Sequence, residues 1–117
     1  MKRKKNDADG LPRGAQRTVI LSLLFREGPL HGYALSRALE EKTGGRFQLR
    51  EGSLYPILHE LELERLVEAS WDRSPEGRKR RVYRLTAGGK REAKAMKKRW
   101  LEVAGLIEAL LGEPSSA

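Results

Sequence analysis

The sequence lacks the residues that several kinds of functional site need. It contains no cysteine, which excludes a disulfide scaffold, a cysteine-ligated zinc site and a thiol nucleophile. Its two histidines, His31 and His59, have no carboxylates spaced around them as in a metal-ligand set. We therefore predict no metal site and no cofactor.

Long apolar runs are missing as well. The longest one, at residues 19–24, is broken by Ser22 and is far too short to cross a bilayer. The basic residues at positions 2–5 are followed by no apolar segment before Leu11, so they do not resemble a signal peptide. Together with the lack of cysteine, these absences predict a cytoplasmic protein with no membrane partner.

No catalytic constellation is present in the sequence either. It holds no nucleophile–base set and no glycine-rich phosphate loop. Its glycine pairs at positions 44–45 and 88–89 stand alone at predicted helix boundaries. We therefore predict that the protein is not an enzyme.

Positive charge is what the sequence has in excess. Lys and Arg number 24 against 16 acidic residues, so the formal net charge is +8 and the isoelectric point is about 10.1. Such a balance favours a polyanionic partner, either a nucleic acid or an acidic membrane surface. A basic but inert solvated surface is the alternative, so the positions of the cations must decide.

The spacing of apolar residues predicts three helices in the first half of the chain. Helical periods occur at residues 12–26, at residues 32–43 and from residue 52 onward. In the third helix Leu54, Ile57, Leu58 and Leu61 define the buried face, and Ser53 or Glu51 is expected to cap its start.

The second half of the chain is predicted to form a β-hairpin and one long helix. Apolar residues alternate at positions 67–72 and 82–85, on either side of a segment rich in turn formers. Thr86 is the expected N-cap of a helix that continues to about Leu111. The order predicts a mainly α (α+β) winged helix-turn-helix. We expect a disordered basic tail at 1–10, a winged-helix DNA-binding domain at 11–86, a C-terminal dimerisation helix at 87–111 and a disordered tail at 112–117.

The predicted last helix carries a seam of apolar residues. Its members are spaced by three, four, three, four and three residues, a heptad pattern typical of helices that pair. They are Ala93, Met96, Trp100, Val103, Ile107 and Leu110. We therefore predict a homodimer that forms through this seam.

The start of the third helix is the predicted reading element for double-stranded DNA. In a winged helix this end lies in the major groove. Pro56 and His59 point away from the predicted core, Tyr55 lies on the flank, and Ser53 precedes the first turn. Ser, Tyr and His side chains donate hydrogen bonds to phosphates or base edges. Ordinary exposed helix residues are the alternative interpretation.

A cluster of cations follows the predicted turn of the hairpin. Its members are Arg78, Lys79, Arg80 and Arg81, and they are predicted to contact the DNA backbone or the minor groove. Strand alternation sends Lys79 and Arg81 to one face and Arg80 to the other, so these cations do not all reach the same phosphates. The alternative is an edge strand that its charges protect from aggregation.

These segments resemble the PadR family of bacterial transcriptional regulators. The matching motifs are LHGYAL at residues 30–35, EGSLYPIL at residues 51–58 and RKRRVYRLT at residues 78–86. The resemblance implies a homodimeric repressor of the short type, with a single C-terminal helix, that binds an inverted-repeat operator and is released by a small molecule. It adds Tyr33 to the expected DNA contacts.

The same resemblance suggests where an effector binds. In some short regulators a Trp on the last helix stacks on flat aromatic drugs, and Trp100 matches that position beside Met96. Packing of Trp100 in the seam is the alternative. The surrounding Lys94, Lys97, Lys98 and Arg99 suit an anionic effector or a plain solvent face. A winged-helix module that binds protein or RNA without an effector is the competing function.

Overall fold

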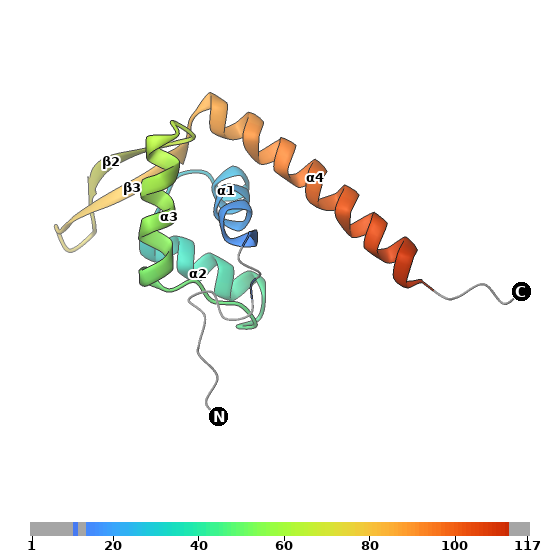
Figure 1. Ribbon diagram of the computed structural model, residues 1–117. Coiled ribbons are helices and arrows are strands. Elements are labelled where there is room, and N and C mark those ends of the chain that lie inside the picture. The colour runs from blue at the N-terminus through green and yellow to red at the C-terminus, as the bar shows by residue number, and fades with distance from the viewer. Residues whose placement is uncertain (1–10, 12–13, 113–117) are drawn as a thin grey trace, which may run out of the picture.

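The computed structural model describes Leu11 and residues 14–112. The predicted tail at 1–10, all but the first residue of the predicted tail at 112–117, and the predicted helix start at Pro12 lie outside the described residues. The elements are α1 (Ala15–Glu27), β1 (Leu30–His31), α2 (Gly32–Lys42), α3 (Glu51–Leu63), β2 (Val67–Arg73), β3 (Lys79–Leu85) and α4 (Ala87–Leu111). Figure 1 shows α1, α2 and α3 gathered beside the hairpin of β2 and β3, with α4 extending away from them. The predicted winged helix-turn-helix fold is confirmed.

The sheet has three antiparallel strands in the order β1-β3-β2. β2 and β3 pair from Val67 opposite Leu85 to Arg73 opposite Lys79, which is the predicted hairpin. β1 was not predicted, because two residues are too few to show a strand period. It pairs Leu30 with Tyr83 and so attaches the start of α2 to the hairpin.

One hydrophobic core joins α1, α2 and α3 to the sheet. Its largest fully buried side chains come from all three helices and are Ile20, Leu21, Leu35, Leu54, Leu58 and Leu61. Val67, Tyr83 and Leu85 close the core from the two hairpin strands. Burial of each large aliphatic side chain contributes about 1.5–3 kcal/mol. The core therefore fixes how α3 lies against the hairpin.

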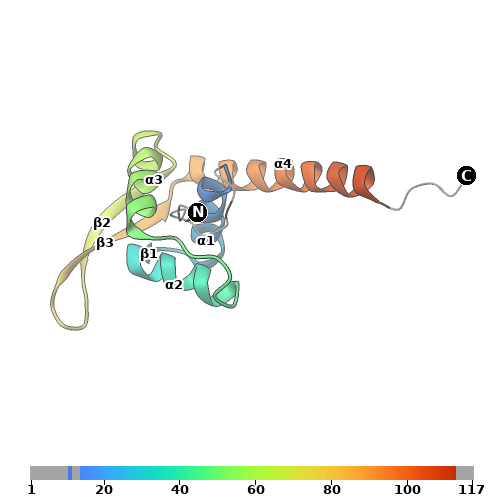
Figure 2. The ribbon, with the colours of Figure 1, turned by 60° about the horizontal axis from the view of Figure 1, so that its bottom comes forward.

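We call the hairpin of β2, β3 and residues 74–78 the wing. Its turn is closed by backbone hydrogen bonds from Gly77 N–H to the Ser74 carbonyl (2.8 Å) and from Ser74 N–H to the Arg78 carbonyl (2.8 Å). Gly77 has φ +86°, which favours glycine. In Figures 1 and 2 the wing projects past α3 on the side of the body opposite to α4.

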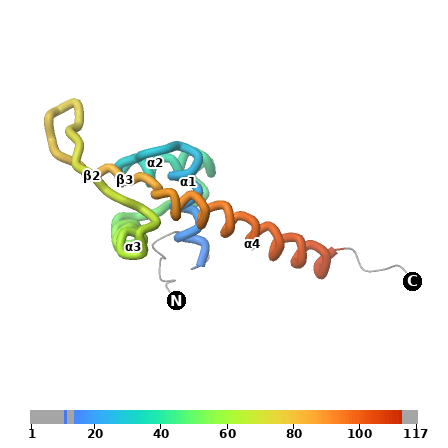
Figure 3. Tube along the Cα trace, turned by 90° about the horizontal axis from the view of Figure 1, so that it is seen from above, coloured from blue at the N-terminus to red at the C-terminus, as the bar shows by residue number. Residues whose placement is uncertain are grey.

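The long helix α4 begins where predicted and has two different halves. Thr86 caps it, its Oγ1 accepting a hydrogen bond from Gly89 N–H (2.9 Å). The first half packs on α1, where the Trp100 indole N–H donates to Thr18 Oγ1 (2.9 Å). Figure 3 shows the second half extending away from the body, and every residue from 101 to 112 is exposed. No helix in the described part of the chain is long and apolar enough to span a membrane.

A substitution at Gly89 tests how the first turn of α4 packs against Leu66. A Cβ at this position would overlap the carbonyl oxygen of Leu66, which also accepts the Thr86 N–H (3.0 Å). We predict that Gly89→Ala lowers the free energy of unfolding by about 1–3 kcal/mol, because the backbone of α4 must move away from Leu66. Urea denaturation measures this.

The neighbouring glycine supplies the control for this prediction. A Cβ at Gly88 would meet its nearest atoms at 3.7 Å, an ordinary contact. Gly88→Ala should therefore leave the stability unchanged or raise it, because alanine favours helix over glycine. Equal effects of the two substitutions would contradict the packing argument.

His31 caps α2 in its neutral form. Its Nδ1 accepts a hydrogen bond from Ala34 N–H (3.4 Å), which a protonated ring cannot do. Desolvation, and then the positive charge of Arg80, lower the pKa of His31, while Asp72 opposes them. The native state therefore binds this proton less readily than the unfolded chain does. The stability that neutral His31 contributes is present above the unfolded pKa and is lost as pH falls through the native pKa.

We predict that His31→Asn weakens the loss of stability between about pH 7.5 and pH 5. Asparagine keeps a capping acceptor but has no proton to bind in this range. Urea denaturation at several pH values measures the difference from the wild type. His59→Asn makes the same replacement on the exposed face of α3 and is the matched control substitution. The same slope for His31→Asn and the wild type would contradict the capping argument.

Candidate nucleic-acid interface

The helix α3 is anchored by one face and exposes the other. Leu54, Leu58 and Leu61 recur at helical spacing and are fully buried. The prediction that Ser53 or Glu51 caps this helix is wrong. The N-cap residue is Arg50, whose side chain makes no capping hydrogen bond. The Arg50 carbonyl accepts hydrogen bonds from the backbone N–H groups of Ser53 and Leu54. The backbone is still extended at Arg50, so the helix begins at the next residue, Glu51.

The residues of α3 that were predicted to contact DNA differ in how exposed their side chains are. Pro56 and His59 are fully on the exposed face, as predicted. Ser53 is only 8% exposed, so little of its side chain is accessible. Tyr55 is 40% exposed, and desolvation raises the pKa of its phenol, with Tyr83 and Glu51 adding to the effect.

Tyr55 lies against the start of α2. A Cβ on Gly32 would overlap the Tyr55 phenol, so only glycine allows the two helices to approach this closely. Tyr55 therefore sets the position of α3 relative to α2, and it still presents part of its ring to solvent.

A second tyrosine lies beside this contact, in the first turn of α2. Tyr33 is 64% exposed, and its hydroxyl accepts a hydrogen bond from Arg37 Nη1 (3.2 Å). The Arg37 guanidinium also lies over the Tyr33 ring, 5.8 Å from its centroid. The bond to Tyr33 raises the pKa of Arg37. Arg37 was not predicted as a site residue, although its spacing of four residues from Tyr33 could have indicated it.

The four predicted cations of the wing fall into two pairs. Arg78 and Lys79 are exposed next to the turn, and neither forms an ion pair with another described residue. Arg80 and Arg81 lie further along β3 and are only partly exposed. The first pair is therefore the more accessible to an anionic partner.

Arg80 and Arg81 have partners inside the molecule. Arg81 Nη2 lies 3.0 Å from an Oε atom of Glu62 on α3, and its guanidinium covers the Trp71 ring at 5.2 Å. Arg80 Nη2 lies 3.8 Å from Asp72 across the hairpin, while its buried Nε has no hydrogen-bond partner in the structure. Arg81 thereby holds the wing against α3, and Arg80 braces the two strands.

Six of the nine predicted DNA-contacting residues come together around one hollow of about 660 Å³. It lies between the start of α2, the side of α3 and the wing. Ten side chains and one glycine line it, namely His31, Gly32, Tyr33, Tyr55, Ser74, Glu76, Arg78, Lys79, Arg80, Arg81 and Tyr83. Arg80 and Arg81 are paired with carboxylates outside the lining, whereas Arg78 and Lys79 are not, and Glu76 is the one acidic residue in the lining. The hollow therefore attracts anions. Pro56, His59 and Ser53 do not line it.

The remaining predicted residues lie on α4. Ala93 is buried and Met96 partly buried against α1, while Trp100, Val103, Ile107 and Leu110 are 41%, 47%, 49% and 73% exposed. The seam is thus internal at its start and open along the second half of the helix. The described residues contain no cluster of His, Asp or Glu side chains able to hold a metal ion.

Comparison with known proteins places this arrangement in a family. The family model described as "Transcriptional regulator PadR-like family" matches residues 20–95. "Uncharacterized protein X" of Lysinibacillus sphaericus is 32% identical over 99 residues, covering 85% of this chain and 90% of that protein.

Solved structures agree with the family match. A PadR-like transcriptional regulator from Bacillus cereus superposes with a TM-score of 0.74 at 28% identity, over 87% of this chain and 96% of that one. Bacillus subtilis PadR, solved in complex with operator DNA, gives a TM-score of 0.61 at 28% identity, over 68% of this chain and 46% of that longer chain. The members of this family are transcriptional regulators rather than enzymes. The chain belongs to the transcriptional regulator PadR-like family, as its sequence motifs predicted.

Proposed function

We propose that this protein is a homodimeric transcriptional repressor that binds an inverted-repeat operator and is released by a small molecule. The winged-helix domain at 11–86 reads the DNA, and the helix at 87–111 joins the two subunits. The exposed end of α3 enters the major groove, and the wing follows the backbone. The observation that carries the proposal is the hollow in which Tyr33, Tyr55 and the four wing cations converge.

The charges and shape of the hollow support contact with DNA. Arg78 and Lys79 are exposed and unpaired among the described residues, so they are available to phosphate oxygens. Tyr33 and Arg37 add a phenol and a guanidinium on the neighbouring turn of α2. Since B. subtilis PadR was solved with operator DNA, the same type of partner is expected for this relative.

The free half of α4 supports the proposed dimer. Large apolar side chains stay exposed along it, namely Leu101, Val103, Leu106, Ile107, Leu110 and Leu111. An isolated helical arm with such a surface gains stability when a partner buries it. A two-fold axis through the seam would repeat each reading head at a fixed separation, which matches an inverted repeat.

The proposed effector site at Met96 and Trp100 adjoins the seam. Trp100 is held to α1 through Thr18 yet keeps 41% of its surface exposed. A ligand that stacks there would lie between the body and the free arm of α4, where it alters the separation of the reading heads.

The test measures binding of the protein to the DNA upstream of its own gene by fluorescence anisotropy at several salt concentrations. We predict affinity well above that for scrambled DNA of the same length. Arg78→Ala and Lys79→Ala should each weaken binding to both DNAs and lower the slope of log affinity against log salt by about 1, because one phosphate contact is lost.

Lys98→Ala is the matched control, since it removes one positive charge from an exposed position on α4. It should keep the wild-type slope. Equal binding to upstream and scrambled DNA would overturn the specific repressor, and tighter binding to single-stranded or folded RNA would favour the competing RNA-binding function.

The dimer has its own prediction. Ile107→Glu places a charge within the seam and should convert the dimer to a monomer in light scattering after size exclusion. Ala109→Glu introduces the same charge on the opposite flank of the helix and should leave the dimer intact. A wild-type chain that is monomeric at micromolar concentration would contradict the dimer.

A further inference from the structure

The wing carries an aromatic ring that the proposed operator site does not use. Trp71 on β2 is 61% exposed, although tryptophan is on average highly buried in folded proteins. It does not line the hollow in which Tyr33, Tyr55 and the wing cations converge. Exposed apolar surface of this size costs free energy in water, and a partner that covers the ring removes that cost.

The register of the hairpin places Trp71 on the strand face that continues the core outward. Residues directly opposite each other project to the same face, and every second residue repeats it. From the core toward the turn, this face carries three opposed pairs, namely Ala69 with Tyr83, Trp71 with Arg81 and Arg73 with Lys79. The first pair packs in the core. The other two pairs form an open surface, which we call the outer wing face.

The indole of Trp71 is held in place from one side. The Arg81 guanidinium lies over the ring, 5.2 Å from its centroid. Arg81 is itself fixed by Glu62 of α3, with 3.0 Å between Nη2 and the carboxylate. One side of the ring is therefore covered by an anchored cation, while much of the indole stays open to solvent. A flat surface that is already ordered loses little entropy when a ligand stacks on it.

The cations beside this ring repel each other. Arg73 and Lys79 are directly opposite and both exposed. Arg73 Nη1 donates a hydrogen bond to the Gly77 carbonyl (2.8 Å), and neither cation forms an ion pair with another described residue. Like charges opposite each other destabilise a hairpin. An anion bound between these two side chains would remove the repulsion.

A hollow of about 390 Å³ joins the ring to these cations. It is lined by Trp71, Asp72, Arg73 and Lys79. The carboxylate of Asp72 is already paired, since it lies 3.8 Å from Arg80 Nη2. Trp71 and Arg73 are roughly 6.6 Å apart along the strand. A nucleotide whose base covers the ring can therefore place its phosphate beside the cations.

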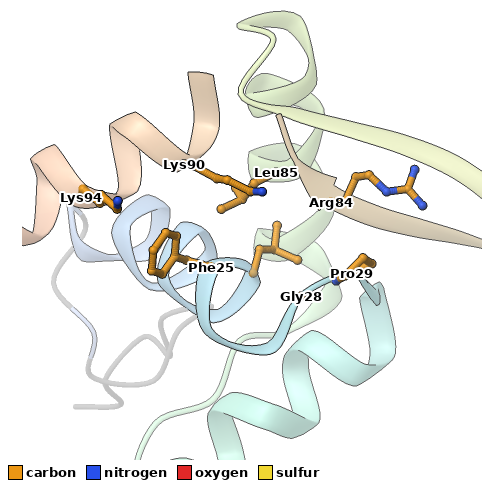
Figure 4. Close-up of a pocket in the computed structure, with 8 residues that line it drawn as sticks. Phe25, Gly28, Pro29, Arg84, Leu85, Lys90 and Lys94 are labelled. Carbon is orange, nitrogen blue, oxygen red and sulfur yellow. The ribbon is translucent and has the colours of Figure 1, made fainter. Parts of the chain in front are cut away.

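The opposite face of the hairpin has a different composition. Its three opposed pairs, Glu68 with Arg84, Ser70 with Val82 and Asp72 with Arg80, contain no aromatic residue. Arg84 Nη1 lies 3.5 Å from Ser70 Oγ. In Figure 4 the Arg84 guanidinium extends away from Phe25 and Lys94. Within the hairpin, the combination of an open ring and two unpaired cations is thus confined to the outer wing face.

Unpaired nucleotides fit this combination better than duplex DNA does. In sites for single strands, bases stack on aromatic side chains while cations hold the phosphates, with little dependence on sequence. In a duplex the faces of the bases are covered by their neighbours, and exposing one costs unstacking energy. Stacking on Trp71 therefore favours a strand whose bases are not paired.

We propose that the outer wing face binds single-stranded DNA, with one base stacked on Trp71 and the flanking phosphates beside Arg73 and Lys79. The proposal goes beyond operator binding, which uses the larger hollow and the exposed face of α3. Among the described residues, the linings of the two hollows share Lys79 alone. Variants at Trp71 and Arg73 therefore test this site without altering the other, and either proposal can fail alone.

The experiment is fluorescence anisotropy of a labelled short oligothymidylate with the full chain at several salt concentrations. We expect Trp71→Ala to lower the affinity about tenfold, because the stacked base loses its platform. Trp71→Phe should retain most of the affinity, since it keeps a flat ring. Arg73→Ala should lower the slope of log affinity against log salt by about 0.7, the value for one phosphate contact on a single strand.

A matched ligand and a matched variant serve as controls. An abasic strand of the same length keeps the phosphates and lacks the bases, so it should bind more weakly, and Trp71→Ala should not change its affinity. Leu63→Ala removes another large side chain that is 71% exposed and lies outside the hollow. It should retain the affinity for oligothymidylate within about twofold. These positions are all exposed, so the variants should fold as the wild type does.

Three results would overturn the proposal. The first is equal affinity of the wild type and Trp71→Ala for oligothymidylate. The second is equal weakening of single-stranded and duplex DNA binding by Trp71→Ala, which would make Trp71 a contact of the duplex. The third is tighter binding of oligouridylate than of oligothymidylate, which would make RNA the ligand of this face.

Discussion

The pairing of β3 with strands on both sides is the constraint on which the rest of the structure depends. Through β1 it holds the start of α2, and through β2 it forms the wing. Arg81 on the same strand is bound to Glu62 of α3. After Leu85 the chain passes through Thr86 directly into α4, whose first turn lies against the Leu66 carbonyl. A shift of β3 would therefore move the wing, α3 and α4 together.

Most of this fold could be predicted from the sequence, because its signals are local. The apolar period of α3, the alternation in the hairpin and the Thr86 cap each depend on residues close in the chain. β1 could not be predicted, since its identity as a strand comes only from pairing with residues more than fifty positions away. The contact of Gly32 with Tyr55 could not be predicted for the same reason, because nothing near Gly32 in the sequence indicates which side chain lies over it.

The residues of the candidate site were largely predicted from the sequence. Which of its cations pair with carboxylates, and which stay accessible, was not predicted. The cluster at residues 78–81 is a uniform run of cations in the sequence. In the structure Arg81 and Arg80 neutralise Glu62 and Asp72, whereas Arg78 and Lys79 remain available. Alternation along the strand separates neighbouring side chains, but only the tertiary fold decides which of them meets a carboxylate. The same applies to Lys94, whose ammonium lies 5.8 Å from the centroid of the Phe25 ring, far away in the sequence.

The two faces of α4 place this helix between the proposed dimer seam and the wing. One face is the seam, which is buried against α1 at Ala93 and open from Val103 onward. The other face carries Lys90 and Lys94 at the junction with α1 and β3. At that junction the strand that forms the wing meets the helix proposed to join the subunits. Since a fixed half-site separation tolerates little change, a small rotation of α4 relative to β3 would be enough to alter affinity for an operator. Such coupling would need no contact between α4 and DNA, because β3 forms one strand of the wing and leads directly into α4.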